Sequence, residues 1–425
     1  MVSPLETFYT RVANGKVSRG KGYGALTPKL PKNAKELTGV VFDGIDISVT
    51  PSLALPPRFE YNVISYTGQS MSDGTLVPGL HDGMAAFPGP DNKVIIVRNH
   101  ELNVDPNGVI ASPVYDQIGG GTTTIVVNQN REVERHFASL AGTIRNCAGG
   151  PTPWGSWVSC EETFNVGKSG VKRHGYNFEV PATANIQVAN PIPIKEMGRF
   201  NHEAIAVDPK TGYVYQTEDR QDSCFYRFRP NQYGNLRSGG ILEALVIQDA
   251  NQDTRINYRR YKNKSLNVKW VKINDFDPVN DTVRNEAQRK GAAIFARGEG
   301  TWYGNGLVYF VCTNGGDVRQ GQVFAYNPAN DTITLVVEST KAKDLNNPDN
   351  VTVSPFGDIF LCEDGSGVEY VQGVNREGEV YRFAANAFKD GSSEFAGVCF
   401  SPDGSTMFVN IQKPGLTLAI WGPWV

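Results

Sequence analysis

A hairpin plan repeated six times is the feature of this sequence that most limits its possible folds. Each copy contains a polar residue, a short strand, a turn with Pro, Gly or Asp, a strand rich in Val, Ile, Phe or Tyr, and a polar or acidic end. Apolar and polar residues alternate in both arms, as expected for β-hairpins. The copies are HDGMAAFPGPDNKVIIVRNHE (81–101), CAGGPTPWGSWVSCEE (147–162), HEAIAVDPKTGYVYQTED (202–219), EGTWYGNGLVYFVCTNGGD (299–317), DNVTVSPFGDIFLCEDG (349–365) and EFAGVCFSPDGSTMFVNIQ (394–412).

The spacing of the copies indicates a propeller. Most intervals between their starting points are close to the roughly 40 to 50 residues of one four-stranded blade. We therefore predict an all-β fold, a six-bladed β-propeller in which residues 1–425 form a single domain. The longest interval contains residues 237–291, which we interpret as a mixed strand and loop insertion in one blade. We also expect the segments EYNVISYTG and TLAIWGPWV, near the two chain ends, to meet in one sheet and close the ring.

Composition agrees with this fold class and excludes several functions. The chain has 45 Gly, 25 Pro, 21 Phe and 17 Tyr in 425 residues, and apolar residues at helical spacing are scarce. The net charge is −3 with dispersed Lys and Arg, so we expect no nucleic-acid partner. No apolar run reaches the roughly 18 residues of a membrane span, so we expect no membrane partner. The polar start, MVSPLETFYTRVANGKVSRG, has no apolar signal segment, which leaves a cytoplasmic protein or one whose signal has been removed.

Possible metal ligands occupy matching places in the repeats. The first strand of a propeller blade lines the channel, so residues just before it gather at one mouth. Many converging carboxylates would repel one another unless cations neutralised them, so we predict a metal site there. The alternative is that acidic residues at strand ends only cap turns or prevent edge pairing. The leading positions are His81-Asp82, Cys147, His202-Glu203, Glu299, Asp349-Asn350 and Glu394, and the second arms end in Glu101, Glu161-Glu162, Glu218-Asp219, Asn314, Glu363-Asp364 and Asn410.

The residue types limit the choice of metal. Carboxylate and amide oxygens suit calcium, and a single thiolate from Cys147 adds iron or zinc as candidates. Cys147 precedes a Gly-Gly pair outside any apolar run, whereas cysteines inside strand-like segments are expected to be small buried hydrophobes. We expect His81, His100 and His202 to be structural groups rather than the three histidines of a zinc site.

Three arginines precede these positions closely. Arg297 stands two residues before Glu299, Arg145 two before Cys147, and Arg199 four before Glu203. A guanidinium beside a centre of several cations suits an anionic ligand such as phosphate. We assign that role to Arg297. For Arg145 and Arg199 we favour pairing with carboxylates.

Several stretches resemble the PhoX family of alkaline phosphatases. They are GGGTTTIVV (119–127), SLAGTIRNCAGGPTPWGSWVSCEE, GRFNHEAIAVDP, NNPDNVTVSPFGDIFLCEDG and EFAGVCFSPDGSTMFVNIQKPG, and together they span most of the chain. The resemblance implies a six-bladed propeller, a mixed iron and calcium cluster at one end of the channel, hydrolysis of phosphate esters, and export to the periplasm or the cell exterior.

The resemblance also implies roles for individual residues. The family's cysteine iron ligand falls on Cys147, and its acidic ligands fall on Glu162, Glu203, Glu299 and Asp349. Arg297 takes the place of the phosphate-contacting arginine. Glu101, Glu161, Asn350 and Asn99 are further candidates as calcium ligands or neighbours of the metals. Long members of the family carry a substrate-binding tryptophan after the glutamate matched by Glu203, where this chain has Ala204.

From these observations we predict a metal-dependent hydrolase of phosphate esters with Fe(3+) and Ca(2+) as cofactors. The nucleophile would be a metal-bound oxygen, and Arg297, Glu299 and Glu203 would be the catalytic residues. We expect a monomer that acts on a small-molecule phosphate ester. The alternatives are a calcium-dependent lactonase or phosphotriesterase on the same propeller, and a non-catalytic calcium-binding propeller. The thiolate argues against the calcium-dependent enzymes, because oxygen and His ligands are sufficient for their sites. A non-catalytic propeller would instead bind calcium alone and release no phosphate from any ester.

Overall fold

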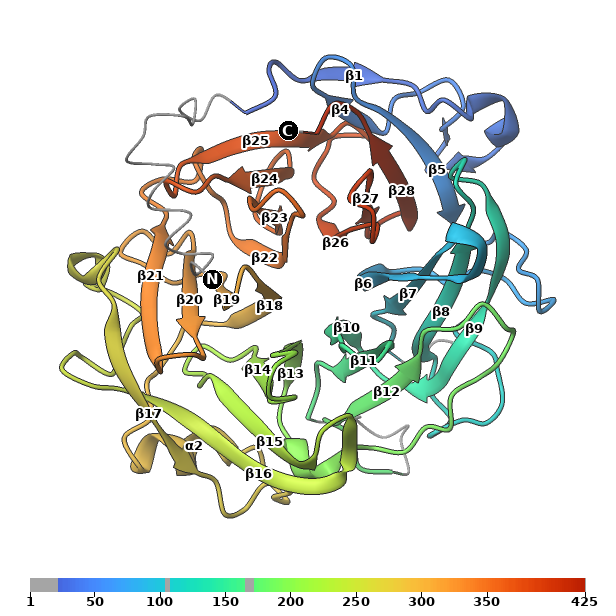
Figure 1. Ribbon diagram of the computed structural model, residues 1–425. Coiled ribbons are helices and arrows are strands. Elements are labelled where there is room, and N and C mark those ends of the chain that lie inside the picture. Colours follow the sequence, from blue (N-terminus) through green and yellow to red (C-terminus); the bar gives the residue numbers. More distant parts are fainter. Residues whose placement is uncertain (1–21, 104–107, 165–171, 425) are drawn as a thin grey trace.

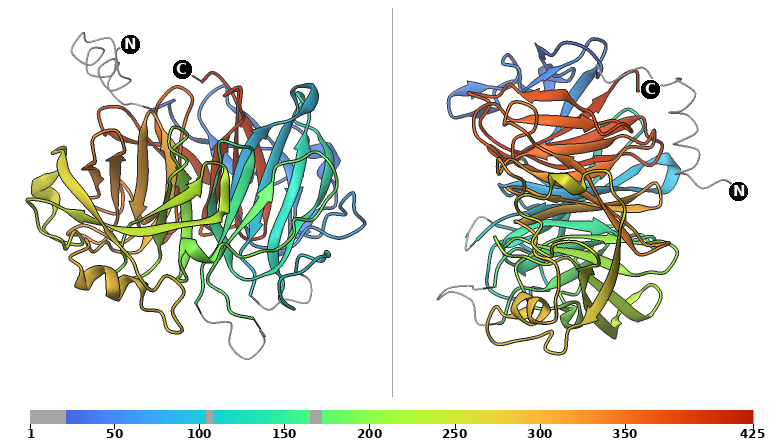
Figure 2. Two further views of the ribbon diagram at one scale, coloured as in Figure 1. Left: turned by 60° about the horizontal axis from the view of Figure 1, so that its bottom comes forward. Right: turned by 90° about the vertical axis from the view of Figure 1, so that its left-hand side faces the viewer.

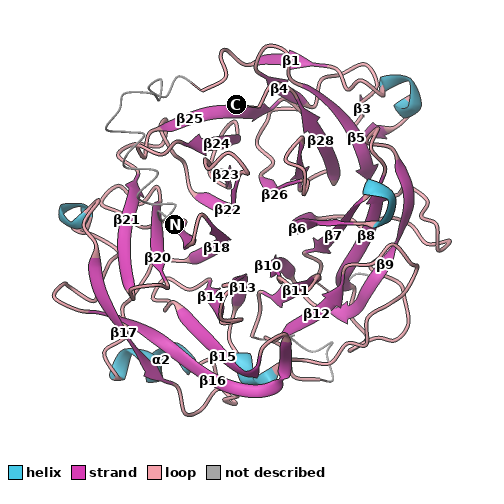
Figure 3. Cartoon of the chain, in the orientation of Figure 1, coloured by secondary structure: helices cyan, strands magenta, loops and turns pink. Residues whose placement is uncertain are grey.

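The computed structural model describes residues 22–103, 108–164 and 172–424 and consists almost entirely of strands and turns (Figures 1 and 3). The sheets are arranged around a common centre in a propeller-like ring, and the long strands run between the two faces of that ring (Figure 2). The prediction of an all-β, propeller-like fold is therefore confirmed. The polar N-terminal stretch, residues 1–20, lies outside the described residues.

Six inner strands surround the axis of the ring, and each contacts the next, so the ring is closed. Each is the first arm of one repeated hairpin. They are β6 (His81–Pro88), β10 (Asn146–Pro151), β13 (His202–Val207), β18 (Gly298–Gly304), β22 (Pro348–Val353) and β26 (Phe395–Phe400).

Antiparallel pairing extends these strands outward. One sheet adds β7 (Val94–His100), β8 (Gly120–Val127) and β9 (Val133–Thr143) to β6, and another adds β11 (Ser156–Glu161) and β12 (Asn177–Pro181) to β10. A third adds β23 (Ile359–Glu363), β24 (Tyr370–Val374), β25 (Val380–Asn386), β4 (Leu53–Leu55) and β1 (Thr27–Lys29) to β22. Strands β2 (Val41–Phe42) and β3 (Ile45–Asp46) form a separate small hairpin.

Two strands from near the ends of the chain meet in one sheet, as the sequence predicts. Strand β26 is followed by β27 (Thr406–Ile411) and β28 (Leu416–Trp421), and β28 pairs with β5 (Glu60–Tyr66). A segment from before the first hairpin thus completes the sheet of the last one. This pairing closes the ring without covalent linkage, through backbone hydrogen bonds that neither strand could form alone.

The segment predicted as an insertion lies in a continuous sheet of nine strands. Here β13 is followed by β14 (Val214–Glu218), β15 (Tyr226–Gln232), β16 (Asn235–Ile247) and β17 (Leu266–Lys272), and β17 pairs with β21 (Thr332–Glu338). Strands β20 (Gln322–Asn327) and β19 (Leu307–Cys312) continue the sheet to β18. Because β17 joins two of the six hairpin units, the sheets do not separate into six blades, and the count of six stays a prediction.

Helices are short in the described residues. Helix α2 (Val283–Arg289) follows β17, and single 3₁₀ turns occur at Ala34–Leu37, Pro90–Asn92, Lys195–Met197 and Arg259–Tyr261. Among the described residues no helix combines the length and apolar character needed to cross a membrane.

Part of the core lies between the two hairpin units that the nine-stranded sheet joins. Phe225, Phe310 and Phe324 stack there, with ring centroids 4.1 and 5.2 Å apart between successive partners. All three are almost completely buried, and each contributes about 2 to 3 kcal/mol of transfer free energy. Trp302 packs against three separate core clusters, so it links sheets near the centre. The packed sheets provide the rigid frame from which the inner hairpins project their first residues.

Candidate metal centre

A β-bulge at the start of each inner strand positions the central side chains. In the first hairpin His81 pairs with His100, and the next pair is Met84 with Arg98, so two residues of β6 face one of β7. Such a bulge bends the strand and redirects the side chain it contains. The same shift follows Asn146, His202, Gly298 and Pro348. The residues placed first in these five bulges are Asp82, Cys147, Glu203, Glu299 and Asp349.

The sixth hairpin differs in one respect. Its register shift falls between Ala396 and Cys399, which puts Gly397 at the place that the other hairpins give to a ligand residue. Gly397 has a φ of 64°, and a Cβ atom there would come within 2.5 Å of the carbonyl oxygen of Asp82. This hairpin contributes Glu394, from just before β26, in place of a bulge residue.

The second arms deliver the residue that directly follows each strand. Glu101 follows β7, Glu162 follows β11, and Asp364 follows β23. Their backbone N–H groups donate to the carbonyl oxygens of Leu80, Arg145 and Asn347, over 3.0, 2.9 and 2.9 Å respectively. Side chains alternate along a strand, so the residue after the strand end points away from the face of the residue before it.

Eight carboxyl groups and one thiol come together at the end of the ring's channel where the inner strands begin, which we call the mouth. They form four overlapping groups of three, and within each group the ligand atoms all lie within 4.8 Å of one another. Cys147, Glu203 and Asp349 each belong to two groups and so connect the set. We call these nine residues the centre. The groups are Asp82, Glu101 and Cys147; Cys147, Glu162 and Glu203; Glu203, Glu299 and Asp349; and Asp349, Asp364 and Glu394.

Burial and mutual repulsion oppose ionisation of the centre. Burial, and then the neighbouring carboxylates, raise the pKa of Glu203 and the pKa of Glu299 well above the ordinary range. The same two causes raise the pKa of Asp349 to about 8 and the pKa of the Cys147 thiol well above its usual value. Protons therefore compensate the charge when no cation is bound, and cations would take their place.

The donor set fits metal ions. Oε2 of Glu203 is buried and has no hydrogen-bond partner in the described structure, and the Sγ atom of Cys147 lies 3.3 Å from Oε1 of the same residue. A buried oxygen without a partner is costly unless a ligand satisfies it. Carboxylate oxygens suit hard cations, and the thiol suits a transition metal.

Arg297 is held at the edge of the centre by two acids. Its Nε and Nη2 atoms donate to the two carboxylate oxygens of Asp219, over 2.7 and 2.9 Å, and Nη2 lies 2.8 Å from Oε1 of Glu299. A bidentate pair of this kind fixes the plane of a guanidinium. The Arg297 side chain is 33% exposed, so the guanidinium contacts solvent as well as the centre.

The other two arginines have different partners. Arg145 contacts Oε1 of Glu101 at 2.6 Å and forms a short contact with Glu162, so its expected pairing with carboxylates is found. Arg199 donates to four backbone carbonyl oxygens, those of Phe164, His174, Pro278 and Val279. The expectation of carboxylate partners is wrong for Arg199, because its side chain lies over the ring of Phe164 among loop carbonyls.

Glu161 is not part of the centre, contrary to the sequence-based assignment. As the last residue of β11, it points into the sheet. Its carboxylate oxygens accept hydrogen bonds from the backbone N–H groups of Ile144, Gly175 and Tyr176 and contact Nδ1 of His174 at 2.7 Å. Glu218 and Glu363, at the same place in their hairpins, are likewise buried among Tyr226, Gln372 and other polar groups.

Asn350 and Asn99 lie beside the centre. Nδ2 of Asn350 donates to Oδ1 of Asp349 over 2.7 Å, and its Oδ1 accepts a hydrogen bond from the backbone of Gly397. Asn99 binds backbone oxygens of Cys147 and Ala148, at 3.1 and 2.6 Å. Both therefore fix ligand-bearing strands.

The histidines have structural partners, as expected. His81 and His202 contact the carbonyl oxygens of Pro78 and Gly198 at 3.0 and 2.9 Å, and His100 contacts that of Gly79 at 2.8 Å.

Four residues that the sequence marks only through their repeat positions lie in the centre or beside it. Asp82, Asp364 and Glu394 belong to the centre, and Asp219 holds Arg297. Each stands at a repeat position that the sequence marks, so the signal was present. The choice between neighbours such as Glu161 and Glu162 required the strand ends.

A small cavity of about 20 Å³ lies further along the channel. Its lining includes Gly83, Ala148, Ala204 and Gly300, each of which directly follows a ligand residue, and Trp302. This volume accommodates about one water molecule. Ala204 is buried and lines this cavity.

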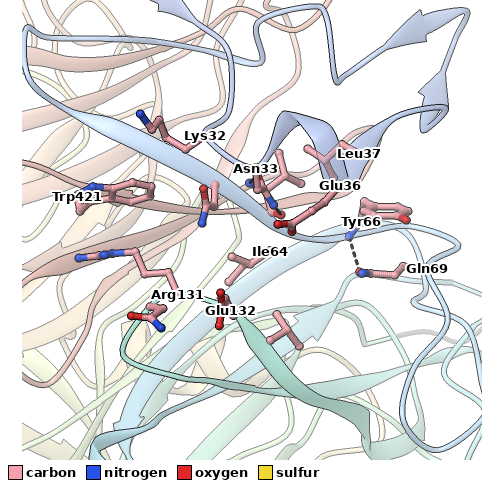
Figure 4. Close-up of a pocket in the computed structure, with 14 residues that line it drawn as sticks. Lys32, Asn33, Glu36, Leu37, Ile64, Tyr66, Gln69, Arg131, Glu132 and Trp421 are labelled. Atoms are coloured by element: carbon pink, nitrogen blue, oxygen red, sulfur yellow. Dashed lines mark hydrogen bonds between the residues drawn. The ribbon is translucent and has the colours of Figure 1, made fainter.

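A larger cavity lies elsewhere in the molecule. It has a volume of about 580 Å³ and is lined by β5 and the β8–β9 turn, among other segments (Figure 4). The guanidinium of Arg131 stacks over the ring of Trp421 there, 4.5 Å from the centroid. The nine residues of the centre do not line this cavity.

Fold and site together define an all-β, propeller-like protein with a buried acidic centre of the kind found in metalloenzymes. The family model described as alkaline phosphatase PhoX matches residues 40–134 and 117–415, which is most of the chain. The chain belongs to the alkaline phosphatase PhoX family and is a phosphoric ester hydrolase.

One solved structure of a PhoX protein has the same fold. Pseudomonas fluorescens PhoX in complex with vanadate, a transition state analogue, is 18% identical, with a TM-score of 0.69 over 88% of this chain and 96% of that one. The gluconolactonase XC5397 from Xanthomonas campestris is 11% identical, with a TM-score of 0.46 over 96% and 100%. Virginiamycin B lyase from Staphylococcus aureus is 11% identical, with a TM-score of 0.38 over 85% and 99%. A comparison with curated protein sequences finds no match.

Proposed function

We propose that this protein hydrolyses small-molecule phosphate esters at the centre, with iron and calcium as its cofactors. The observation that carries the proposal is the joining of one thiol and eight carboxyl groups by overlapping contacts at a single mouth. Family membership supports the reaction class. The metals, their number and the individual ligand roles are part of the proposal.

The side chains divide by chemistry. Cys147 would hold iron together with Glu162 and Glu203, since a thiolate prefers a transition metal. The two all-oxygen groups that share Asp349 would hold calcium. Asn350 and Asn99 would support the ligands through the hydrogen bonds they already make. When bound, the cations supply positive charge that offsets the negative charge developing on the phosphoryl group and the leaving oxygen.

The protein's own residues position the substrate. Arg297 would donate to a non-bridging phosphoryl oxygen from its exposed edge, while Asp219 keeps the guanidinium plane fixed. Glu203 and Glu299, which are grouped with Asp349, would hold the cations that face the reacting group. The cavity beside Trp302 is too small for a phosphate ester, so substrate would enter from the mouth and not through the channel.

We further propose that the ring counts six blades within one domain and that the protein is an exported monomer. The closed circuit of contacts among the six inner strands supports the blade count. Proteins of the PhoX family are typically exported, which supports export of this chain.

Phosphate release from p-nitrophenyl phosphate tests the proposal. We expect turnover that is lost on chelation and restored by iron with calcium. A panel that includes a lactone and a phosphate triester separates the rival enzymes. Activity on a lactone alone, or no activity on any member of the panel, would overturn the proposal.

A further inference from the structure

Arg145 and Arg297 occupy equivalent places in two hairpins. Each stands two residues before a residue of the centre, and their backbone φ angles are 45° and 46°. Their carbonyl oxygens accept hydrogen bonds from the residues after the second strands, Glu162 over 2.9 Å and Thr313 over 3.0 Å. A left-handed conformation is uncommon for arginine, so its recurrence shows that the hairpin sets both side chains in the same way.

Each guanidinium also links an acid of the preceding hairpin to an acid of its own. Arg145 links Glu101 of the preceding hairpin to Glu162 of its own. Arg297 links Asp219 of the preceding hairpin to Glu299 of its own. Each side chain is 33% exposed. The two arginines are therefore matched in place, in their partner on the preceding hairpin and in access to solvent, whereas the partner in their own hairpin differs.

An acidic pair lies between them. Burial raises the pKa of Glu162, Asp219 lies close enough to raise it further, and each of these two acids is paired with one of the two arginines. The order along this arc of the mouth is Arg145, Glu162, Asp219 and Arg297. Because two carboxyl groups separate the guanidiniums along the arc, the two forks present separate anion-binding edges.

We propose that Arg145 is a second substrate-binding residue, and that the preferred substrates carry a second phosphoryl group, which it binds. This inference rests on the proposed function, in which Arg297 binds the phosphoryl group that is released. The contacts of Arg145 involve Nε and Nη2, and a guanidinium has five N–H donors. A planar fork with an exposed edge suits a phosphoryl oxygen, and its permanent charge compensates a second dianion. In the hydrolysis, water adds to the released phosphoryl group, one P–O bond breaks, and the product that leaves keeps its other phosphoryl group.

The test compares one and two phosphoryl groups. The kcat and KM values for p-nitrophenyl phosphate and for adenosine diphosphate are measured with the wild type, Arg145→Gln and Arg145→Lys, alongside metal content. Arg145→Gln is expected to raise the KM for adenosine diphosphate about tenfold or more, as for loss of a charge-assisted hydrogen bond, and the KM for p-nitrophenyl phosphate by no more than about threefold. Arg145→Lys should be intermediate, since it keeps the charge but not the fork.

The control variant is Arg229→Gln. Arg229 is 37% exposed and pairs with Glu243 on the β15–β16 hairpin, so the change removes a similar ion pair without touching the centre. It should behave as wild type. Equal effects of Arg145→Gln on both substrates, or metal loss without a selective change in KM, would overturn the proposal.

Failure of the proposed function gives a different pattern. In that case the wild type itself releases no phosphate from either compound. Binding of adenosine diphosphate to the metal-loaded protein, measured by calorimetry, then decides the role of Arg145. Weaker binding by Arg145→Gln than by Arg229→Gln supports it, and equal binding contradicts it.

Discussion

The Sγ atom of Cys147 lies 3.3 Å from Oε1 of Glu203, although 56 positions separate the two residues in the chain. Equivalent bulges in neighbouring inner strands produce this contact. A thiol and a carboxyl group that are both buried and both resist ionisation gain little from each other. Under the proposed function, a cation that binds both would account for their proximity.

Replacement of Cys147 tests the role of the thiol in catalysis. We expect Cys147→Ala to lower kcat for p-nitrophenyl phosphate by at least about 100-fold, because outer-shell partners of a metal already account for 10- to 100-fold effects. Cys160→Ala is the matched control, since Cys160 is completely buried in the same hairpin but outside the centre. Undiminished turnover by Cys147→Ala would contradict the thiolate role.

Arg297→Lys tests the fixed guanidinium. Lysine keeps the charge but cannot make the paired contacts with Asp219, so we expect kcat/KM to fall about 10- to 100-fold while metal content stays the same. Steady-state kinetics and elemental analysis measure the two quantities. A variant that loses metal in proportion to activity would show that Arg297 serves the ligands and not the substrate.

The stability of the metal-free protein should fall as pH rises. The folded-state pKa of Asp349 is about 8, above its ordinary value near 4, so between these pH values the folded state holds a proton that the unfolded state has lost. Stability from this group is complete below about pH 4 and decreases toward pH 8. Thermal melting of chelated protein at pH 5 and pH 8 measures the difference.

Added calcium and the Asp349→Asn variant show whether the centre causes this pH dependence of stability. Added calcium should raise the melting temperature more at pH 8 than at pH 5, because cations replace protons at the centre. The variant Asp349→Asn should show a weaker dependence on pH. A metal-free protein that becomes more stable between pH 5 and pH 8 would contradict the account of the centre.

Gly83→Ala tests the close approach of the inner strands. An added Cβ would lie 2.6 Å from Cα of Ala148 and 2.9 Å from the carbonyl oxygen of Cys147, both backbone atoms. We expect a loss of about 1 to 3 kcal/mol in the free energy of unfolding, as in overpacked cores. Gly79→Ala is the control, because its nearest neighbour would be 3.9 Å away. Denaturant unfolding compares them, and equal stabilities would show that the strands can separate without cost.

The sequence predicts the fold class and the position of the site better than the contacts of individual side chains. Periodic hairpins indicate the fold class, and the matching polar positions indicate the mouth where Cys147, Glu203, Glu299 and Asp349 meet. The pairing of β5 with β28 also follows from strand-like segments near the two ends. These features depend on local pattern, which a single sequence contains.

Features that depend on register could not be predicted in this way. Glu161 and Glu162 are adjacent and chemically alike, and only the end of β11 determines which of them faces the centre. The bulges leave no mark beyond small residues such as Gly83 after the ligand position. The carboxylate partners expected for Arg199 are replaced by backbone carbonyl oxygens, some of them from a loop distant in the chain, which a sequence pattern does not indicate.

Elemental analysis of the purified protein tests the central claim most directly. We expect iron and calcium in at least equimolar amounts per chain, and loss of the iron in Cys147→Ala but not in Cys160→Ala. Protein that contains neither metal after purification, and takes up neither when both are supplied, would contradict the claim that these hairpins bind cations at a common mouth.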